Sequence, residues 1–217
     1  MQNEREPIAI GVVTAGISKV KDDHGRVTPD KIGMKRLARL AAELRRNPLL
    51  IVFMWGGYVG PKGMVIVDVY LDFFRRVYKD LAYIEVITVG DFEVSVDNIP
   101  VAAARLKKVL DRGARFIAIV TEPEHFAWLR YPWEALGFHV QNWDSGAELS
   151  ELMKKAHGFL TWVTKGDYFW KGPLWGRLCG AYVSGDAKKF KNTCKKLLRV
   201  IVIVTARAFG SMAGSAI

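Results

Sequence analysis

Residues 116–125 read FIAIVTEPEH, and this stretch decides the fold class. Its first five residues are apolar without alternation, which is typical of a strand covered on both faces in a parallel sheet. Polar residues and a proline follow at once, so the strand is expected to end near Thr121 and a helix to begin near Glu122. That helix would carry His125 in its first turn.

Four more short runs in the first 150 residues predict strands, and all but the last are nearly continuously apolar. Short apolar runs that predict strands alternate with amphipathic stretches that predict helices, and the other runs are Ile8–Val13, Leu49–Met54, Ile84–Val89 and Phe138–Gln141. A β-α-β series of this kind gives right-handed crossovers. The sequence therefore predicts an α/β, Rossmann-like, three-layer fold, an open parallel sheet of about five strands with helices on both faces.

Caps and prolines predict where the helices begin and end. The expected boundary signals are a Thr28-Pro29 cap, an Asn47-Pro48 stop, a second helix from about Met64 to Leu81, a third from Asp97 or Asn98, and a Ser145/Glu148 capping box for a fifth. Pro132 is expected to kink or interrupt the fourth helix, because a proline inside a helix removes a hydrogen bond.

Composition narrows the class of protein further. The chain has 217 residues, 50% of them hydrophobic and 25% charged, which excludes a disordered chain, a collagen-like repeat and a coiled coil. Two cysteines cannot build a disulfide scaffold or a four-cysteine zinc site, and we expect no metal. No targeting segment and no membrane span are recognisable, so the expected location is the cytoplasm, with the inner face of the membrane as a second possibility.

The positive charge lies mainly near the C-terminus. Residues 151–217 hold 12 Lys/Arg and 3 Asp/Glu, so most of the net charge of +10 lies there. The sequence predicts a Rossmann-like domain over residues 1–165 and a helical basic extension over 166–217. The extension either docks on the domain with its lysines outward or binds an anionic membrane surface through lysines and aromatic residues. Nucleic acid is the least favoured partner, because no binding motif is present.

Small and polar residues follow the predicted strands. Ligands of open α/β sheets bind beyond the carboxyl ends of the strands, where the strand order reverses. That rule selects Gly16, Gly56, Gly57, Asp91, Asn98, Thr121 and Glu122 as candidates to hold a ligand. For the glycines the alternative is a tight turn, and for Asn98 it is a helix cap.

His125 is the candidate catalytic residue. Neutral imidazole could hydrogen-bond a ligand or act as a general base, whereas the alternative is a surface or capping histidine. Neighbouring acids and the helix N-terminus act on its pKa in opposite directions, so the sign of the shift stays open. No nucleophile motif such as Gly-x-Ser-x-Gly is present, and whether the protein is an enzyme is left open.

Several of these stretches together resemble one family. Val120-Thr121-Glu122-Pro123-Glu124-His125 resembles the Val-Thr-Ser-x-x-His signature of the YdcF/SanA/ElyC-like proteins, a bacterial family of unknown function. Trp55-Gly56-Gly57 resembles its Ser-Gly-Gly turn, Ser95-Val96-Asp97-Asn98 its Thr-x-Glu-Asn motif, and the stretch from Trp133 to Val140 its aromatic-x-x-x-Gly-x-x-Val stretch. The resemblance covers about residues 7–165 in the right order.

The resemblance implies a Rossmann-like domain that binds a small ligand. Some members are associated with S-adenosylmethionine, and others with integrity of the cell envelope. It implies a ligand set of Gly16, Gly56, Gly57, Asn98 and His125, and by analogy of fold a ribose contact at Asp91 or Glu93. This sequence departs from the family at Trp128, where arginine is usual, and at Trp55, where serine is usual. The expected function is therefore binding of S-adenosylmethionine or a nucleotide-like ligand. Whether the protein is an enzyme stays open, and if it is one, it is expected to be S-adenosylmethionine-dependent or hydrolase-like. The alternative is a non-enzymatic factor at the cell envelope or membrane surface that acts through its tail.

Overall fold

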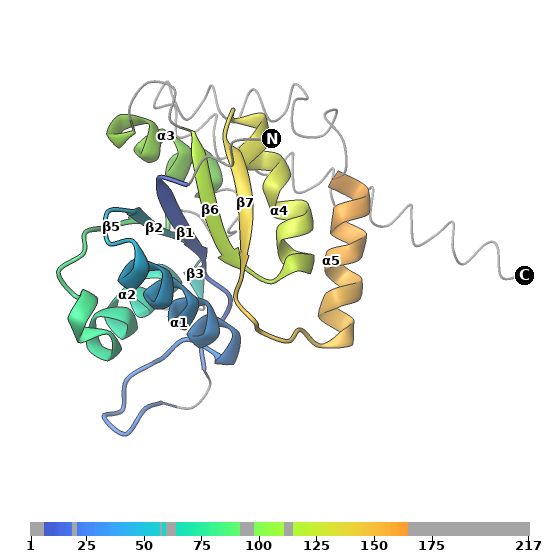
Figure 1. The fold of residues 1–217 in the computed structure, drawn as a ribbon. Helices are drawn as coiled ribbons and strands as arrows, with labels where there is room; N and C mark the ends of the chain where they lie inside the picture. Colours follow the sequence, from blue (N-terminus) through green and yellow to red (C-terminus); the bar gives the residue numbers. More distant parts are fainter. Residues whose placement is uncertain are drawn as a thin grey trace, which may run out of the picture.

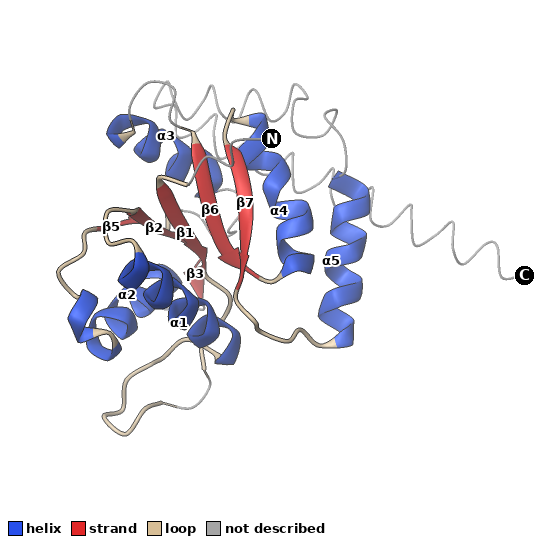
Figure 2. Ribbon diagram, viewed as in Figure 1, coloured by secondary structure: helices blue, strands red, loops and turns tan. Residues whose placement is uncertain are grey.

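The computed structural model of the chain describes residues 7–18, 21–56, 58–59, 64–91, 98–110 and 115–164. Five strands form one parallel sheet, shown in red in Figure 2: β1 (Ala9–Val13), β2 (Ile51–Trp55), β5 (Val86–Val89), β6 (Phe116–Thr121) and β7 (His139–Asp144). The predicted α/β, Rossmann-like fold is confirmed. The predicted extension over residues 166–217 lies outside the described residues.

The sheet is covered by helices on both faces (Figure 1). On one face lie α1 (Lys31–Arg46) and α2 (Ile66–Val77), and on the other lie α3 (Ile99–Val109) and α4 (Pro123–Ala135). Successive residues of a strand point to opposite faces. In β1, accordingly, Ile10 and Val12 pack toward α1 and α2, whereas Ala9 and Val13 pack toward α3 and α4. This two-sided burial is why the central strands β1, β2 and β6 carry nearly unbroken apolar runs.

A fifth helix, α5 (Glu151–Thr164), lies beside α4 on the outside of the domain (Figure 1). The hydroxyl of Ser150 accepts a hydrogen bond from the backbone N–H of Met153 at 3.3 Å. The predicted capping box at Ser145 is therefore wrong, because that hydroxyl donates to Glu122 instead.

Two further helix boundaries differ from the predictions. Asp30, not Thr28, caps α1, and its carboxylate accepts from the N–H of Gly33 at 2.7 Å. Residues Met64–Val65 form strand β4, which pairs antiparallel with β3 (Tyr58–Val59), so α2 begins only at Ile66. After α2 the chain forms a short 3-10 helix, Lys79–Leu81.

Two helix predictions concern α3 and α4. The helix α3 begins at Ile99 with Asn98 just before it, as predicted. The helix α4 continues through Pro132 without interruption, and Gly137 follows it with a positive φ of 83°. A left-handed residue at the end of a helix is the usual place for glycine.

The strand order across the sheet is β5-β2-β1-β6-β7. From β1 the chain moves outward through β2 to β5, and then returns to place β6 on the other side of β1. The order therefore reverses between β1 and β6, and the carboxyl ends of these two strands form the switch point at which ligands of such folds bind.

Candidate functional site

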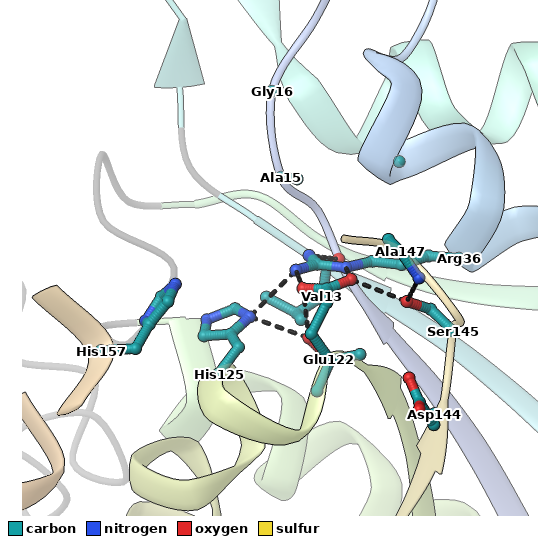
Figure 3. Close-up of polar contacts among 12 residues, drawn as sticks. Val13, Ala15, Gly16, Arg36, Glu122, His125, Asp144, Ser145, Ala147 and His157 are labelled. Carbon is teal, nitrogen blue, oxygen red and sulfur yellow. Dashed lines mark hydrogen bonds and ion pairs between the residues drawn. The ribbon is translucent and has the colours of Figure 1, made fainter. Parts of the chain in front are cut away.

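A buried arginine crosses the switch point. Arg36 lies on α1 among its inward-facing leucines and is only 2% exposed. Its guanidinium donates to the carboxylate of Glu122 through two nitrogens, to the carbonyl oxygen of Val13 at 2.7 Å, and to Nδ1 of His125 at 3.0 Å (Figure 3). Arg36 thus joins the end of β1 to the residues that follow β6.

Glu122 holds the other charge of this pair. It precedes α4 but its side chain does not cap that helix, because the carboxylate is turned to Arg36 and also accepts from the hydroxyl of Ser145 at 2.7 Å. Burial alone would raise the pKa of Glu122, but the hydrogen bonds and charge of Arg36 outweigh burial and the pKa is lowered. Glu122 is therefore an anion whose charge is already compensated.

His125 is neutral, and its tautomer is determined by its neighbours. A guanidinium can only donate, so Nδ1 of His125 accepts from Arg36. The hydroxyl oxygen of Thr121 lies 2.8 Å from the same nitrogen and donates to a carboxylate oxygen of Glu122 at 3.4 Å. The proton of the ring must then lie on Nε2. Burial, followed by the charge of Arg36, lowers the pKa of His125 well below its ordinary value. This answers the question of sign that the sequence left open.

The ring of His125 lies beside a second histidine. His157 comes from α5, and the two ring centroids are 4.8 Å apart (Figure 3). The indole N–H of Trp128 donates to Nδ1 of His157 at 3.0 Å, so His157 also accepts at Nδ1. Burial and the charge of Arg36 lower the pKa of His157. Trp128, the departure from the family pattern, thus serves as the hydrogen-bond partner of a histidine.

The turn after β1 is held by hydrogen bonds between its backbone and a tyrosine of α2. The hydroxyl of Tyr70 accepts from the N–H of Ala15 at 2.8 Å and donates to the carbonyl oxygen of Gly16 at 3.2 Å. Burial raises the pKa of the Tyr70 phenol, which keeps it protonated. A Cβ at Gly16 would lie 2.8 Å from a carboxylate oxygen of Asp30, so the glycine allows the turn and the cap of α1 to approach closely.

The next strand end carries a second polar group. Asn98 is fully buried, and its amide donates to the carbonyl oxygen of Gly56 at 2.7 Å. It neither caps α3 with its side chain nor lies at the reversal of strand order, so neither alternative from the sequence describes its position fully. Thr14 packs against the α-carbon of Gly56, where a Cβ would lie 1.7 Å from its hydroxyl oxygen. That hydroxyl is buried with no hydrogen-bond partner among the described residues.

The remaining candidates lie apart from this cluster. Asp91 follows the edge strand β5 and forms an exposed ion pair with Arg105 at 3.2 Å. Gly57 lies outside the described residues, as do Glu93 and Asp97. Trp55 is fully buried beneath α3 and α4, stacked on Phe53, so this departure from the family adds an aromatic ring to the core.

The structure therefore brings Gly16, Thr121, Glu122 and His125 together with residues that the sequence reasoning missed, namely Arg36, Tyr70, Ser145 and His157. The position of Arg36 in the sequence could have indicated a buried partner. Arg36 occupies an inward position of α1, one residue before Leu37 and four before Leu40, and a charge within an apolar stripe requires a buried partner. No sequence pattern indicated that His157 belongs to the site, because its neighbours come from a different helix.

The geometry favours a donor role for His125. A general base must accept a proton, but Nδ1 is occupied by Arg36 and Thr121, and Nε2 already carries hydrogen. No partner for Nε2 lies among the described residues, so its N–H is available to a ligand. The same tautomer argues against His125 as a metal ligand through Nε2, and within the described part of the chain no three His, Cys, Asp or Glu side chains are arranged so that they could hold a metal ion.

Comparisons with known proteins provide no relative. No protein-family model matches the chain, and it matches neither a curated protein nor a solved structure. Among the described residues, none of the helices has the length and hydrophobicity that crossing a bilayer requires. The likeness of residues 7–165 to the YdcF/SanA/ElyC-like proteins consequently rests on the motifs themselves.

Proposed function

We propose that this protein binds a small ligand of the adenosyl type, such as S-adenosylmethionine or a nucleotide-like molecule, at the carboxyl ends of β1 and β6. The observation that carries the proposal is His125, which is 9% exposed, neutral and fixed at the point where the strand order reverses, with an Nε2–H that has no partner among the described residues. The family resemblance supports the same ligand class, because His125 occupies the histidine position of the Val-Thr-Ser-x-x-His motif, with Glu122 in place of the serine.

The charges around His125 support a binding site in which the residues are held in place before the ligand arrives. Arg36 and Glu122 compensate each other, and the imidazole is held at Nδ1 by a hydrogen bond from Arg36 and a close contact with the Thr121 hydroxyl. Little side-chain freedom is then lost when a ligand accepts a hydrogen bond from Nε2–H, and this favours affinity.

Isothermal titration of the full-length protein with S-adenosylmethionine, adenosine and ATP tests the proposal. We expect at least one of them to bind, and His125→Ala to raise its Kd about tenfold, the equivalent of one lost hydrogen bond. His24→Ala, at an exposed loop histidine, is the matched control. Absence of heat with every ligand, in protein that melts cooperatively, would remove the proposal.

A second candidate function follows from the basic and aromatic residues near the C-terminus. Residues 151–217 combine 12 basic residues with seven aromatic ones after Gly166, a composition suited to an anionic membrane surface. We propose peripheral membrane binding as the alternative. Flotation with phosphatidylglycerol and phosphatidylcholine vesicles should separate the full chain from a form ending at residue 166. Equal flotation of the two would exclude it.

A further inference from the structure

The helix that binds phosphate in many Rossmann folds is closed to an anion in this protein. In those folds the first helix begins directly after β1, and its free N–H groups face the phosphate. Here residues 14–30 intervene between β1 and α1, and the carboxylate of Asp30 accepts the N–H of Gly33. A negative charge therefore already occupies the N-terminus of α1.

The same carboxylate faces the turn after β1. One oxygen of Asp30 lies 2.8 Å from the position that a Cβ of Gly16 would take. An anionic group that approached Gly16, as a phosphate approaches the glycine turn of a dinucleotide site, would meet this carboxylate at close range.

The N-terminus of α4 is no better suited to phosphate. Pro123, its first residue, has no N–H to donate, and Glu124 adds a carboxylate in the first turn. Glu122 precedes both, but its charge is compensated by Arg36. An anion near this helix end would therefore meet the carboxylate of Glu124.

Arg36, the buried cation at the switch point, is committed to groups of the protein. Arg36 uses four of the five N–H groups of its guanidinium on Glu122, Val13 and His125. Lys35, one residue earlier on α1, is exposed and donates to the carbonyl oxygen of Gly146 at 2.6 Å. The neutral donors that remain without a partner among the described residues are Nε2–H of His125 and the hydroxyl of Thr14.

We infer that the ligand of this site carries no phosphate, and that it presents a hydrogen-bond acceptor on an uncharged or cationic face to Nε2–H of His125. A nucleoside or a sulfonium nucleoside fits this description, and a nucleoside phosphate does not. The inference rests on the proposed function, since it narrows the ligand class of the same site.

Matched titrations of the full-length protein with adenosine, AMP and S-adenosylmethionine test the inference. We expect adenosine and S-adenosylmethionine to bind, and AMP to bind at least about tenfold more weakly than adenosine. Asp30→Asn keeps an oxygen for the cap and removes the charge, so it should reduce this discrimination. Asp80→Asn, which removes a carboxylate facing Arg45 at the opposite end of α1, should leave it unchanged.

The outcomes separate this inference from the proposed function. If AMP binds as tightly as adenosine or more tightly, the inference is wrong while ligand binding stands. If AMP is rejected but Asp30→Asn and Asp80→Asn both leave the ratio unaltered, the assignment to Asp30 is wrong. If no ligand binds to folded protein, the proposed function fails and the inference fails with it.

Discussion

The guanidinium of Arg36 lies 3.0 Å from Nδ1 of His125, although 89 positions separate the two residues in the chain. Because the guanidinium has no lone pair to offer, this contact places the imidazole proton on Nε2. The chemical character of His125 is thus decided by a residue on another helix and not by its own motif.

In the Arg36→Met variant, His125 should no longer be held in a single neutral tautomer. Without the guanidinium, Nδ1 keeps only the Thr121 hydroxyl, which can accept as well as donate, so both neutral tautomers become accessible. Nitrogen-15 NMR of the imidazole ring should find hydrogen on Nε2 in the native protein and a mixture in the variant. Identical ring spectra in a folded Arg36→Met protein would show that Arg36 does not set the tautomer.

The buried ion pair should be costly to break from one side. Arg36→Met leaves the Glu122 carboxylate buried without its counter-charge, and we expect the free energy of unfolding to fall by about 3–5 kcal/mol. Arg36→Met combined with Glu122→Leu should lose much less than the sum of the two single variants, because neither charge is then stranded. Urea denaturation measures all three.

The exposed pair Arg45–Asp80 is the control for this cycle. Both side chains are about half exposed, so its removal should have a much smaller effect. A strictly additive result at Arg36 and Glu122 would contradict an ion pair that matters for stability.

Acidification should destabilise the fold below about pH 6.5 through His125. The folded-state pKa is lowered, so between that value and the ordinary value of 6.5 the unfolded chain binds a proton that the folded chain refuses. Stability is then fully present above pH 6.5 and falls with pH, by up to about 1.4 kcal/mol per pH unit for one proton.

His125→Gln should remove this part of the slope and leave the part due to His157. Glu122, whose pKa is also lowered, acts in a separate window below its ordinary value of 4.5. Unfolding free energies measured from pH 7 to pH 4 would detect the difference. An unchanged slope between pH 6.5 and pH 5 in the variant would contradict a neutral, buried His125.

Two glycines that lie within helices should respond oppositely to alanine. At Gly33 a Cβ would lie 2.0 Å from the hydroxyl oxygen of Tyr70, so Gly33→Ala should disturb the support of the turn after β1 and lower the melting temperature. At Gly158 in α5 no atom lies within 4 Å, so Gly158→Ala should stabilise the protein by about 0.5–1 kcal/mol through helix propensity. Equal effects at the two sites would argue against the Tyr70 contact.

The parallel sheet could be predicted because its central strands β1, β2 and β6 are almost unbroken apolar runs, whereas β7 is polar at several positions. Local pattern determines that outcome, since both faces of every central strand must be covered. Helix starts were harder to predict. Thr28, Asp30, Ser145 and Ser150 are all competent caps, and only the fold decides which one meets a free N–H. The β3–β4 hairpin was missed because the run from Met64 to Leu71 looks equally helical.

The candidate site was predictable in part. The rule that ligands bind at strand ends selects Gly16, Thr121, Glu122 and His125 without any knowledge of the strand order. It cannot select Arg36 or His157, because they reach the site from helices whose packing follows from the whole fold. Asp91 satisfied the same rule but lies on the edge strand, where Arg105 pairs with it.

Because β6 returns to the side of β1, where Ala9 pairs with Ile117, we expect the cluster of Arg36, Glu122 and His125 to form late in folding. Contacts between segments remote in sequence slow folding relative to local contacts. Arg36 and Glu122 come into contact only when β6 has paired with β1. The magnetic resonance signal of the imidazole ring therefore reports a completely assembled domain, and partly folded forms should lack it.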